Sequence, residues 1–96
     1  MRLHNIVWSQ QAQKRFLQIL IWYKQERGND FANKFYKGIY STVELIATMP
    51  TIGTVYKTSN NRIYYSFLSH PSYRIVYRFT KTTLYVVAIR ATAMQE

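Results

Sequence analysis

The segment Arg62–Arg90 constrains the fold more than any other part of the chain, because it contains the clearest strand pattern. At its centre the chain reads Tyr-Arg-Ile-Val-Tyr-Arg-Phe over residues 73–79. Successive side chains of a strand point to opposite faces. One face is therefore aromatic and aliphatic (Tyr73, Ile75, Tyr77, Phe79), and the other carries two guanidinium groups (Arg74, Val76, Arg78). We expect the apolar face to seal a core and the cationic face to meet an anionic or protein target.

The same segment predicts three consecutive strands, at about Arg62–Leu68, Tyr73–Thr80 and Thr83–Ala91. The turns between them are His70-Pro71-Ser72 and Lys81-Thr82, and such short links join antiparallel neighbours. Upstream, Thr51–Asn61 is interpreted as a connector, in which Val55-Tyr56 adds a strand residue or two. We expect Ala91–Glu96 to form a frayed tail.

The N-terminal half predicts a short strand over Asn5–Trp8, a helix capped by Ser9, and a second helix capped by Asn29 or Asp30. Gly28 separates the helices and Pro50 ends the second. Both helices show apolar residues three and four positions apart. The first stripe is Ala12, Phe16, Ile19, Leu20, Tyr23; the second is Phe31, Phe35, Ile39, Val43, Ile46, with Ala32, Tyr36 and Leu45 beside it.

These elements predict an α+β domain over residues 1–96, in the order β-α-α-β-β-β. A twisted, mainly antiparallel sheet is covered on one face by a helical hairpin. The opposite sheet face is left partly open, and we expect it to hold Arg74 and Arg78.

Charge is the most informative property of the composition. Thirteen Lys and Arg against four Asp and Glu give a net charge of +9, and residues 50–95 contain no acid. Such a field attracts nucleic acid, an anionic membrane or an acidic protein. A solvated basic surface explains the helical cations, whereas the strand cations favour a binding role.

Several classes of protein are disfavoured. Without cysteine there is no disulfide or thiolate metal site, which fits a cytoplasmic protein. No segment resembles a signal peptide or a membrane span. His4 and His70 are far apart in the sequence and have no acid near them, so we expect both to be exposed and structural, with no metal and no cofactor bound.

Nearly the whole chain resembles the RelE/ParE toxin superfamily of bacterial type II toxin–antitoxin systems. The resemblance rests on the order and spacing of several pieces. These are Ile6-Val7-Trp8-Ser9 followed by Ala12 and Trp22-Tyr23; Ala32, Phe35 and Ile39; Leu45, Pro50 and Gly53; Tyr73-Arg74-Ile75-Val76-Tyr77-Arg78; and Leu84–Arg90. The resemblance implies the same β-α-α-β-β-β order.

The resemblance also implies function. RelE-like members cut messenger RNA on the ribosome without metal, and ParE-like members inhibit DNA gyrase. Both are growth-inhibiting toxins, known also from plasmid stabilisation systems, and an antitoxin with an extended, often acidic segment neutralises them. We therefore expect a hetero-oligomer with a cognate antitoxin, whose acidic segment with apolar anchors lies over the helical hairpin or the sheet groove, and no membrane partner.

The site residues follow partly from the resemblance. Arg74 stands where RelE-type nucleases place a phosphate-contacting Arg, and Arg62 is a recurring basic position. Ala93 and Gln95 stand where many relatives carry His and Arg, which favours a ParE-like gyrase inhibitor, and no enzyme, over a RelE-like nuclease. A non-toxic antitoxin-binding relative is the further alternative. The candidates for target or phosphate binding are Lys57, Arg62, Arg74, Arg78 and Arg90.

If the chain were a nuclease, its catalytic residues would be Arg74, Arg62 and Tyr64. The cations would hold phosphate and a phenol would move the proton. Tyr64 is the best of four possible donors, because it shares a strand face with Arg62; the others are Tyr65, Tyr77 and Tyr85. For any one of them, ordinary strand packing is the alternative. Trp22 is expected in the core, with antitoxin docking as the alternative.

Overall fold

The computed structural model describes residues 2–70 and 72–92, which form two helices and five strands. In chain order these are β1 (Asn5–Trp8), α1 (Gln10–Arg27), α2 (Asn29–Thr48), β2 (Thr54–Ser59), β3 (Arg62–His70), β4 (Tyr73–Phe79) and β5 (Thr83–Ala91). Within this part of the chain, no helix is both long enough and apolar enough to span a bilayer. The α+β class is confirmed, with one strand more than predicted.

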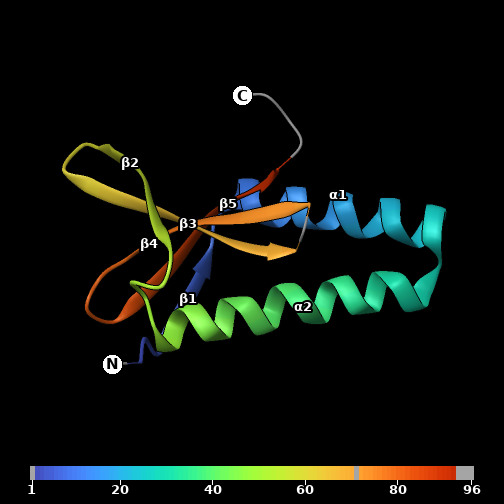
Figure 1. The fold of residues 1–96 in the computed structure, drawn as a ribbon, viewed down its shortest axis with the longest axis horizontal. Helices are drawn as coiled ribbons and strands as arrows, with labels where there is room; N and C mark the ends of the chain where they lie inside the picture. The colour runs from blue at the N-terminus through green and yellow to red at the C-terminus, as the bar shows by residue number, and fades with distance from the viewer. Residues whose placement is uncertain (1, 71, 93–96) are drawn as a thin grey trace.

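The strands form one sheet in the order β1-β5-β4-β3-β2 (Figure 1). β1 runs parallel to β5, with Asn5 opposite Thr83 and Trp8 opposite Val86. The other neighbouring pairs are antiparallel, as their short connections predict. The first strand of the chain therefore lies beside the last described strand, and β1 and β2 form the two edges of the sheet.

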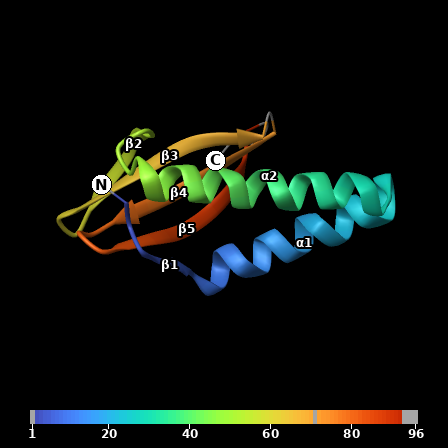
Figure 2. The same cartoon turned by 90° about the horizontal axis from the view of Figure 1, so that it is seen from below.

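Both helices lie on one side of the sheet (Figure 2). Ser9 caps α1 as predicted, because its Oγ accepts a hydrogen bond from the Ala12 N–H at 3.0 Å. The start of α2 differs from the prediction: its N-cap is Gly28, without a side-chain cap, so neither Asn29 nor Asp30 has that role. Gly28 has a φ of 89°, which glycine adopts without steric cost, and this lets one residue link the two helices.

The core lies between the helices and the sheet. The predicted stripes supply most of it, together with the apolar face of the sheet (Leu3, Ala12, Phe16, Ile19, Tyr23, Ala32, Phe35, Ile39, Val43, Ile46, Ala47, Ile75, Tyr77, Leu84, Val86, Ile89). Tyr73 and Phe79 pack against this cluster, so the predicted apolar face of β4 is confirmed. Leu20 also packs against it from its margin.

Two aromatic residues predicted to be buried are exposed. Trp22 is 50% exposed near the end of α1, and Phe31 is 37% exposed in the first turn of α2. Both lie near the helix–helix turn, which extends past the sheet (Figure 1). The predicted burial of Trp22 and Phe31 is therefore wrong, because helical periodicity does not show where the sheet beneath a helix ends.

The connector predicted over Thr51–Asn61 contains the strand β2, in which every residue is exposed. β2 and β3 form a hairpin whose turn residues, Asn60 and Asn61, have φ values of 53° and 63°. Two successive positive φ values are typical of the tight turn that suits twisted strands, and asparagine tolerates them. Because neither face of β2 is buried, its sequence lacks the alternation that identified β4.

A buried phenol holds the segment that leads into β2. The Tyr77 hydroxyl donates to the Pro50 carbonyl at 2.8 Å and accepts from the Gly53 N–H at 3.0 Å. The Tyr77 side chain is completely buried. A Cβ at Gly53 would lie 2.7 Å from the Ser66 carbonyl oxygen and from the Tyr77 hydroxyl, so only glycine fits without displacing a neighbour. This contact fixes where β2 begins.

Candidate target-binding face

The sheet face opposite the helices carries the predicted arginines. Arg74 and Arg78 alternate along β4 with the core residues Ile75 and Tyr77. On β3, Arg62 and Tyr64 likewise alternate with Tyr65, which packs against the core. We call this surface the cationic face, defined by Arg62, Arg74, Arg78, Arg90, Lys57, Tyr56, Tyr64 and Tyr85.

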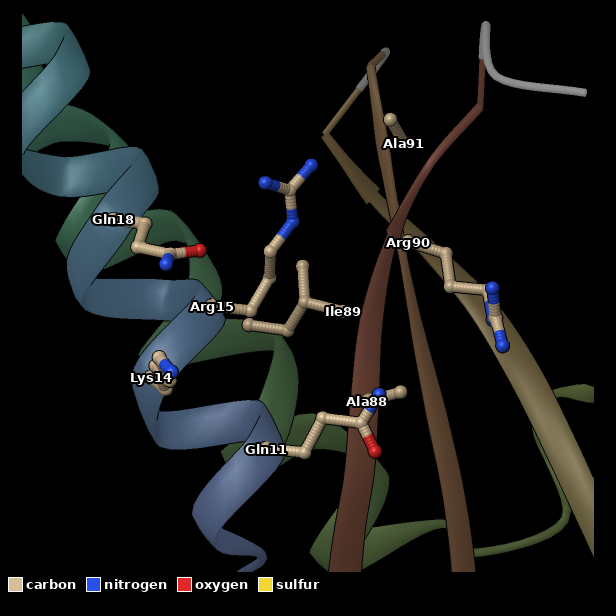
Figure 3. Close-up of a pocket in the computed structure, with 8 residues that line it drawn as sticks. All are labelled: Gln11, Lys14, Arg15, Gln18, Ala88, Ile89, Arg90 and Ala91. Atoms are coloured by element: carbon tan, nitrogen blue, oxygen red, sulfur yellow. The ribbon is translucent and has the colours of Figure 1, made fainter. Parts of the chain in front are cut away.

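A bulge places Arg90 on this face. Val76 pairs with Ala88 and the next residue, Tyr77, pairs with Val86, which leaves Val87 as an extra residue in β5. Such an insertion reverses the alternation of the strand beyond it. Leu84 and Val86 therefore face the core, whereas Arg90 points away from α1 (Figure 3).

The cationic face is curled. The Arg90 guanidinium carbon lies 6.0 Å from the centre of the Tyr56 ring, although β4 and β3 separate their two strands. Small residues form the floor beneath: Ser66, Val76 and Ala88 are all buried, and Val76 and Ala88 lie outside the main core. Arginine and tyrosine side chains therefore form a layer over a floor of small residues.

The arginines are held by rings and hydroxyls. The Arg78 guanidinium carbon lies 3.9 Å from the centre of the Tyr85 ring, directly opposite it in the sheet. Stacking of this kind orients a guanidinium while its edge stays available. Arg74 Nε donates to Ser66 Oγ at 3.2 Å. Arg74 is also directly opposite Arg90, so two like charges are neighbours.

The remaining predicted residues lie nearer the β2–β3 hairpin. Lys57 Nζ is 5.5 Å from the centre of the Tyr64 ring, and the two residues are register partners. Arg62 is exposed and lines a shallow hollow of about 480 Å³ with Arg78. The fold therefore brings together Arg74 with Arg90, Arg62 with Arg78, and Lys57 with Tyr64.

Two of the four candidate proton donors do not lie on the cationic face. Tyr65 and Tyr77 stack on the opposite side of the sheet, with ring centres 5.5 Å apart. Burial raises the pKa of the Tyr77 phenol, and its hydroxyl is already bonded to Pro50 and Gly53. The proposal of Tyr65 and Tyr77 as donors is wrong, because β3 and β4 point these rings into the protein.

Sequence reasoning missed Tyr56 and Ser66. Tyr56 is the extra residue at a bulge in β2, between the pairs Val55–Tyr65 and Lys57–Tyr64. No signal in the sequence marks this bulge or the curl that carries Tyr56 toward Arg90. For Ser66 the sequence does contain a signal, because a residue two positions after Tyr64 on the same predicted strand faces the same side of the sheet.

Carboxylates are segregated from this face. Of the four acids, Glu26 and Asp30 lie beside the turn between the helices, Glu44 lies on α2, and Glu96 falls outside the described residues. Ala93 and Gln95, singled out from the sequence, also fall outside them. Across residues 2–70 and 72–92, no three potential metal-ligating side chains cluster. His4 is exposed, as predicted.

Comparison with solved structures gives the same fold. The chromosomal ParDE toxin–antitoxin system of P. aeruginosa aligns with a TM-score of 0.73 at 14% identity, covering 91% of this chain and 94% of that one. A YoeB dimer from Staphylococcus aureus aligns at 0.58 and 23% identity, covering 94% and 97%. A YoeB/ParE toxin from Agrobacterium tumefaciens aligns at 0.59 and 15% identity, covering 91% and 96%.

Comparison of sequences identifies the family. No curated protein matches the chain. A family model, that of the ParE toxin of the type II toxin–antitoxin system parDE, matches residues 6–96. The match includes both helices, all but the first residue of β1, and the whole cationic face. The chain belongs to the ParE toxin family of type II toxin–antitoxin systems.

Proposed function

We propose that this chain is a ParE-like toxin that acts in the cytoplasm by binding DNA gyrase through its cationic face, without cutting RNA. The observation that carries the proposal is the make-up of that face. It gathers arginine guanidinium groups and tyrosine rings, while the described acids lie on the helical side of the molecule. Such a surface binds an anionic or acidic target well.

The same make-up argues against nuclease chemistry. Cleavage of RNA without metal requires a group that takes the proton of the 2′-hydroxyl. Carboxylates and imidazoles are the usual bases, and neither lies among the described side chains of the cationic face. A RelE-like activity keeps one supporting observation, the pairing of Lys57 with Tyr64, which would combine a phosphate contact with a phenol.

The test compares two assays on one protein preparation. We expect the purified chain to inhibit gyrase supercoiling of plasmid DNA and to leave messenger RNA intact on translating ribosomes. Replacing one arginine that bonds an anionic group removes about 1.5–3 kcal/mol, or roughly a ten- to hundred-fold loss of potency. Arg78→Ala should show this loss, whereas Lys34→Ala, an exposed change on α2, should not.

Three outcomes separate the alternatives. Ribosome-dependent cleavage that disappears in Tyr64→Phe would replace the proposal with a RelE-like nuclease. A chain that binds its antitoxin but neither inhibits gyrase nor arrests growth on controlled expression would be a non-toxic relative. Inhibition of supercoiling, together with growth arrest relieved by the antitoxin, supports the proposal.

A further inference from the structure

Three cations of the cationic face lie over tyrosine rings, and one of these pairs is much closer than the others. The Arg78 guanidinium carbon lies 3.9 Å from the centre of the Tyr85 ring. In the other two pairs the charged group lies 5.5 Å and 6.0 Å from the ring centre, for Lys57 over Tyr64 and for Arg90 over Tyr56. Attraction between a cation and a ring extends to about 6 Å. Of the three pairs, only Arg78 with Tyr85 lies well inside that range.

The backbone around this pair is firmly held. Arg78 and Tyr85 are directly opposite in the register of β4 and β5. The turn that joins these strands is closed by hydrogen bonds: the Thr80 N–H donates to the Thr83 carbonyl at 2.9 Å, and the Thr83 N–H donates to Thr80 Oγ1 at 3.2 Å. The other two cation–ring pairs each include a residue of β2, in which every residue is exposed. The close pair is therefore on the more rigid part of the cationic face.

The ring is the contact that holds the Arg78 side chain. Among residues 2–70 and 72–92, Arg78 forms no hydrogen bond and no ion pair, and the Tyr85 hydroxyl forms no hydrogen bond either. Arg74 differs, because Ser66 Oγ accepts a hydrogen bond from its Nε. The Arg78 side chain is half-buried, so its guanidinium is still accessible to a ligand. What holds Arg78 is therefore the face of the Tyr85 ring rather than its hydroxyl.

A guanidinium that is already held loses less entropy on binding. A free arginine side chain has many rotamers in water, and ordering it in a complex costs free energy. Arg62 lines the same hollow as Arg78, so repulsion between the two cations also drives Arg78 away from a fixed position. The Tyr85 ring opposes both effects before a target arrives. Removing the ring should therefore weaken binding about three- to ten-fold, the range expected for ordering one long side chain.

We propose that Tyr85 is a positioning residue, whose ring holds the Arg78 guanidinium in the orientation in which it binds an anionic group of the target. Arg78 is then the anchor of the cationic face that is already formed in the free chain. The Tyr85 hydroxyl has no part in this role, in contrast to the proton transfer considered for it from the sequence. The proposal rests on the proposed function only in requiring a target, and it holds whichever target that is.

Nuclear magnetic resonance of the free chain tests the contact without any target. A proton that lies over the face of an aromatic ring is shifted upfield by the ring current. We expect the Arg78 Hε signal of the ¹⁵N-labelled full chain, assigned by its absence in Arg78→Lys, to show such a shift. It should lie farther upfield than the signals of Arg27 and Arg90, whose guanidinium carbons lie 5.5 Å and 6.0 Å from their rings. The shift should persist in Tyr85→Phe and disappear in Tyr85→Leu.

A double-mutant cycle tests whether the contact serves binding. Tyr85→Leu should raise the concentration that half-inhibits gyrase about three- to ten-fold, whereas Tyr85→Phe, which keeps the ring, should change it less than about two-fold. In an Arg78→Ala background Tyr85→Leu should change it less than about two-fold, because the side chain that the ring positions is gone. The matched control is Tyr36→Leu, which removes an exposed ring from α2 and should leave the potency unchanged.

The two proposals fail in different ways. A chain that shows the upfield Arg78 signal but does not inhibit gyrase overturns the proposed function and supports the positioning role. The same cycle is then measured on growth arrest, which requires no knowledge of the target. An Arg78 signal without an upfield shift overturns the positioning role, even if the chain inhibits gyrase.

Three further results would overturn the positioning role. Equal losses of potency in Tyr85→Phe and Tyr85→Leu would assign the function to the hydroxyl. A loss in Tyr85→Leu that persists in the Arg78→Ala background would mean that the ring contacts the target itself or only supports the sheet. If Tyr85→Leu does not fold, Tyr85→Trp takes its place. Its ring is the best partner for a cation, so both the upfield shift and the potency should be preserved, and loss of either would contradict the proposal.

Discussion

Replacing Tyr77 by phenylalanine tests the contact on which the geometry of the cationic face depends. The hydroxyl joins the Pro50 carbonyl and the Gly53 N–H to β4, and residues 50–53 lead directly into β2. β2 carries Lys57 and Tyr56, so the contact positions one side of the cationic face. Tyr77→Phe removes one oxygen atom and leaves the ring in its place.

The expected loss of stability follows from the two hydrogen bonds. Each hydrogen bond contributes a net of about 0.5–1.5 kcal/mol to the free energy of unfolding. Removing the hydroxyl leaves the buried Pro50 carbonyl without its partner, which raises the loss toward the upper part of that range. Pro50 and Tyr77 are both buried, so water does not replace the hydroxyl. We expect the free energy of unfolding to fall by about 2 kcal/mol, which for a chain of this size lowers Tm by roughly 8–16 °C.

Urea denaturation followed by circular dichroism measures this loss. The midpoint should fall by about 1 M while the slope stays constant, since the surface exposed on unfolding is unchanged. The control is Tyr65→Phe: Tyr65 stacks on Tyr77 at 5.5 Å, but its hydroxyl forms no hydrogen bond among the described residues. We expect its loss to be below about 0.5 kcal/mol. Equal losses in the two variants would refute the role assigned to the Tyr77 hydroxyl.

Three further predictions use the same urea denaturation assay. Burial raises the pKa of Tyr77 above its ordinary 10.0, so the unfolded chain loses its phenol proton first. Its contribution to stability is therefore complete below about pH 10 and is lost as the pH rises further, so the decline in stability above about pH 10 should be shallower in Tyr77→Phe. Gly53→Ala should destabilise by about 1–3 kcal/mol, because its Cβ meets the Ser66 carbonyl. Gly38 lies on α2 with open space where a Cβ would be, so Gly38→Ala should instead stabilise the protein by about 0.5–1 kcal/mol. If both substitutions changed the free energy of unfolding in the same direction, the tight packing at Gly53 or the open space at Gly38 would be contradicted.

Local periodicity was sufficient to locate a helix or strand along the chain when that element has one buried face and one exposed face. α1 begins after its predicted cap and ends at the predicted glycine, and β4 buries the predicted face. β2 could not be found in this way, because all six of its residues are exposed and only pairing with β3 makes it a strand. Pairing between strands depends on register, which no short window of sequence contains.

In the candidate site, too, alternation along a strand predicts the position of some residues and not of others. Alternation placed Arg74 and Arg78 on the open face, but simple alternation along β5 would put Arg90 beside the core residues Leu84 and Val86. The bulge at Val87 reverses this. Contacts such as Arg90 with Tyr56 depend on bulges and curl that accumulate over four strands, and these are properties of the assembled sheet.

The parallel pairing of β1 with β5 has a consequence for the order of events during synthesis. β1 pairs with a strand that begins at Thr83, so β1 cannot join the sheet until the helices and strands between the two have been made. Contacts between residues so far apart in sequence form slowly, whereas the helical hairpin is local and forms early. A nascent chain therefore exposes the apolar stripes of its helices and has no complete cationic face. The cationic face is complete only once β5, which carries Tyr85 and Arg90, has been made.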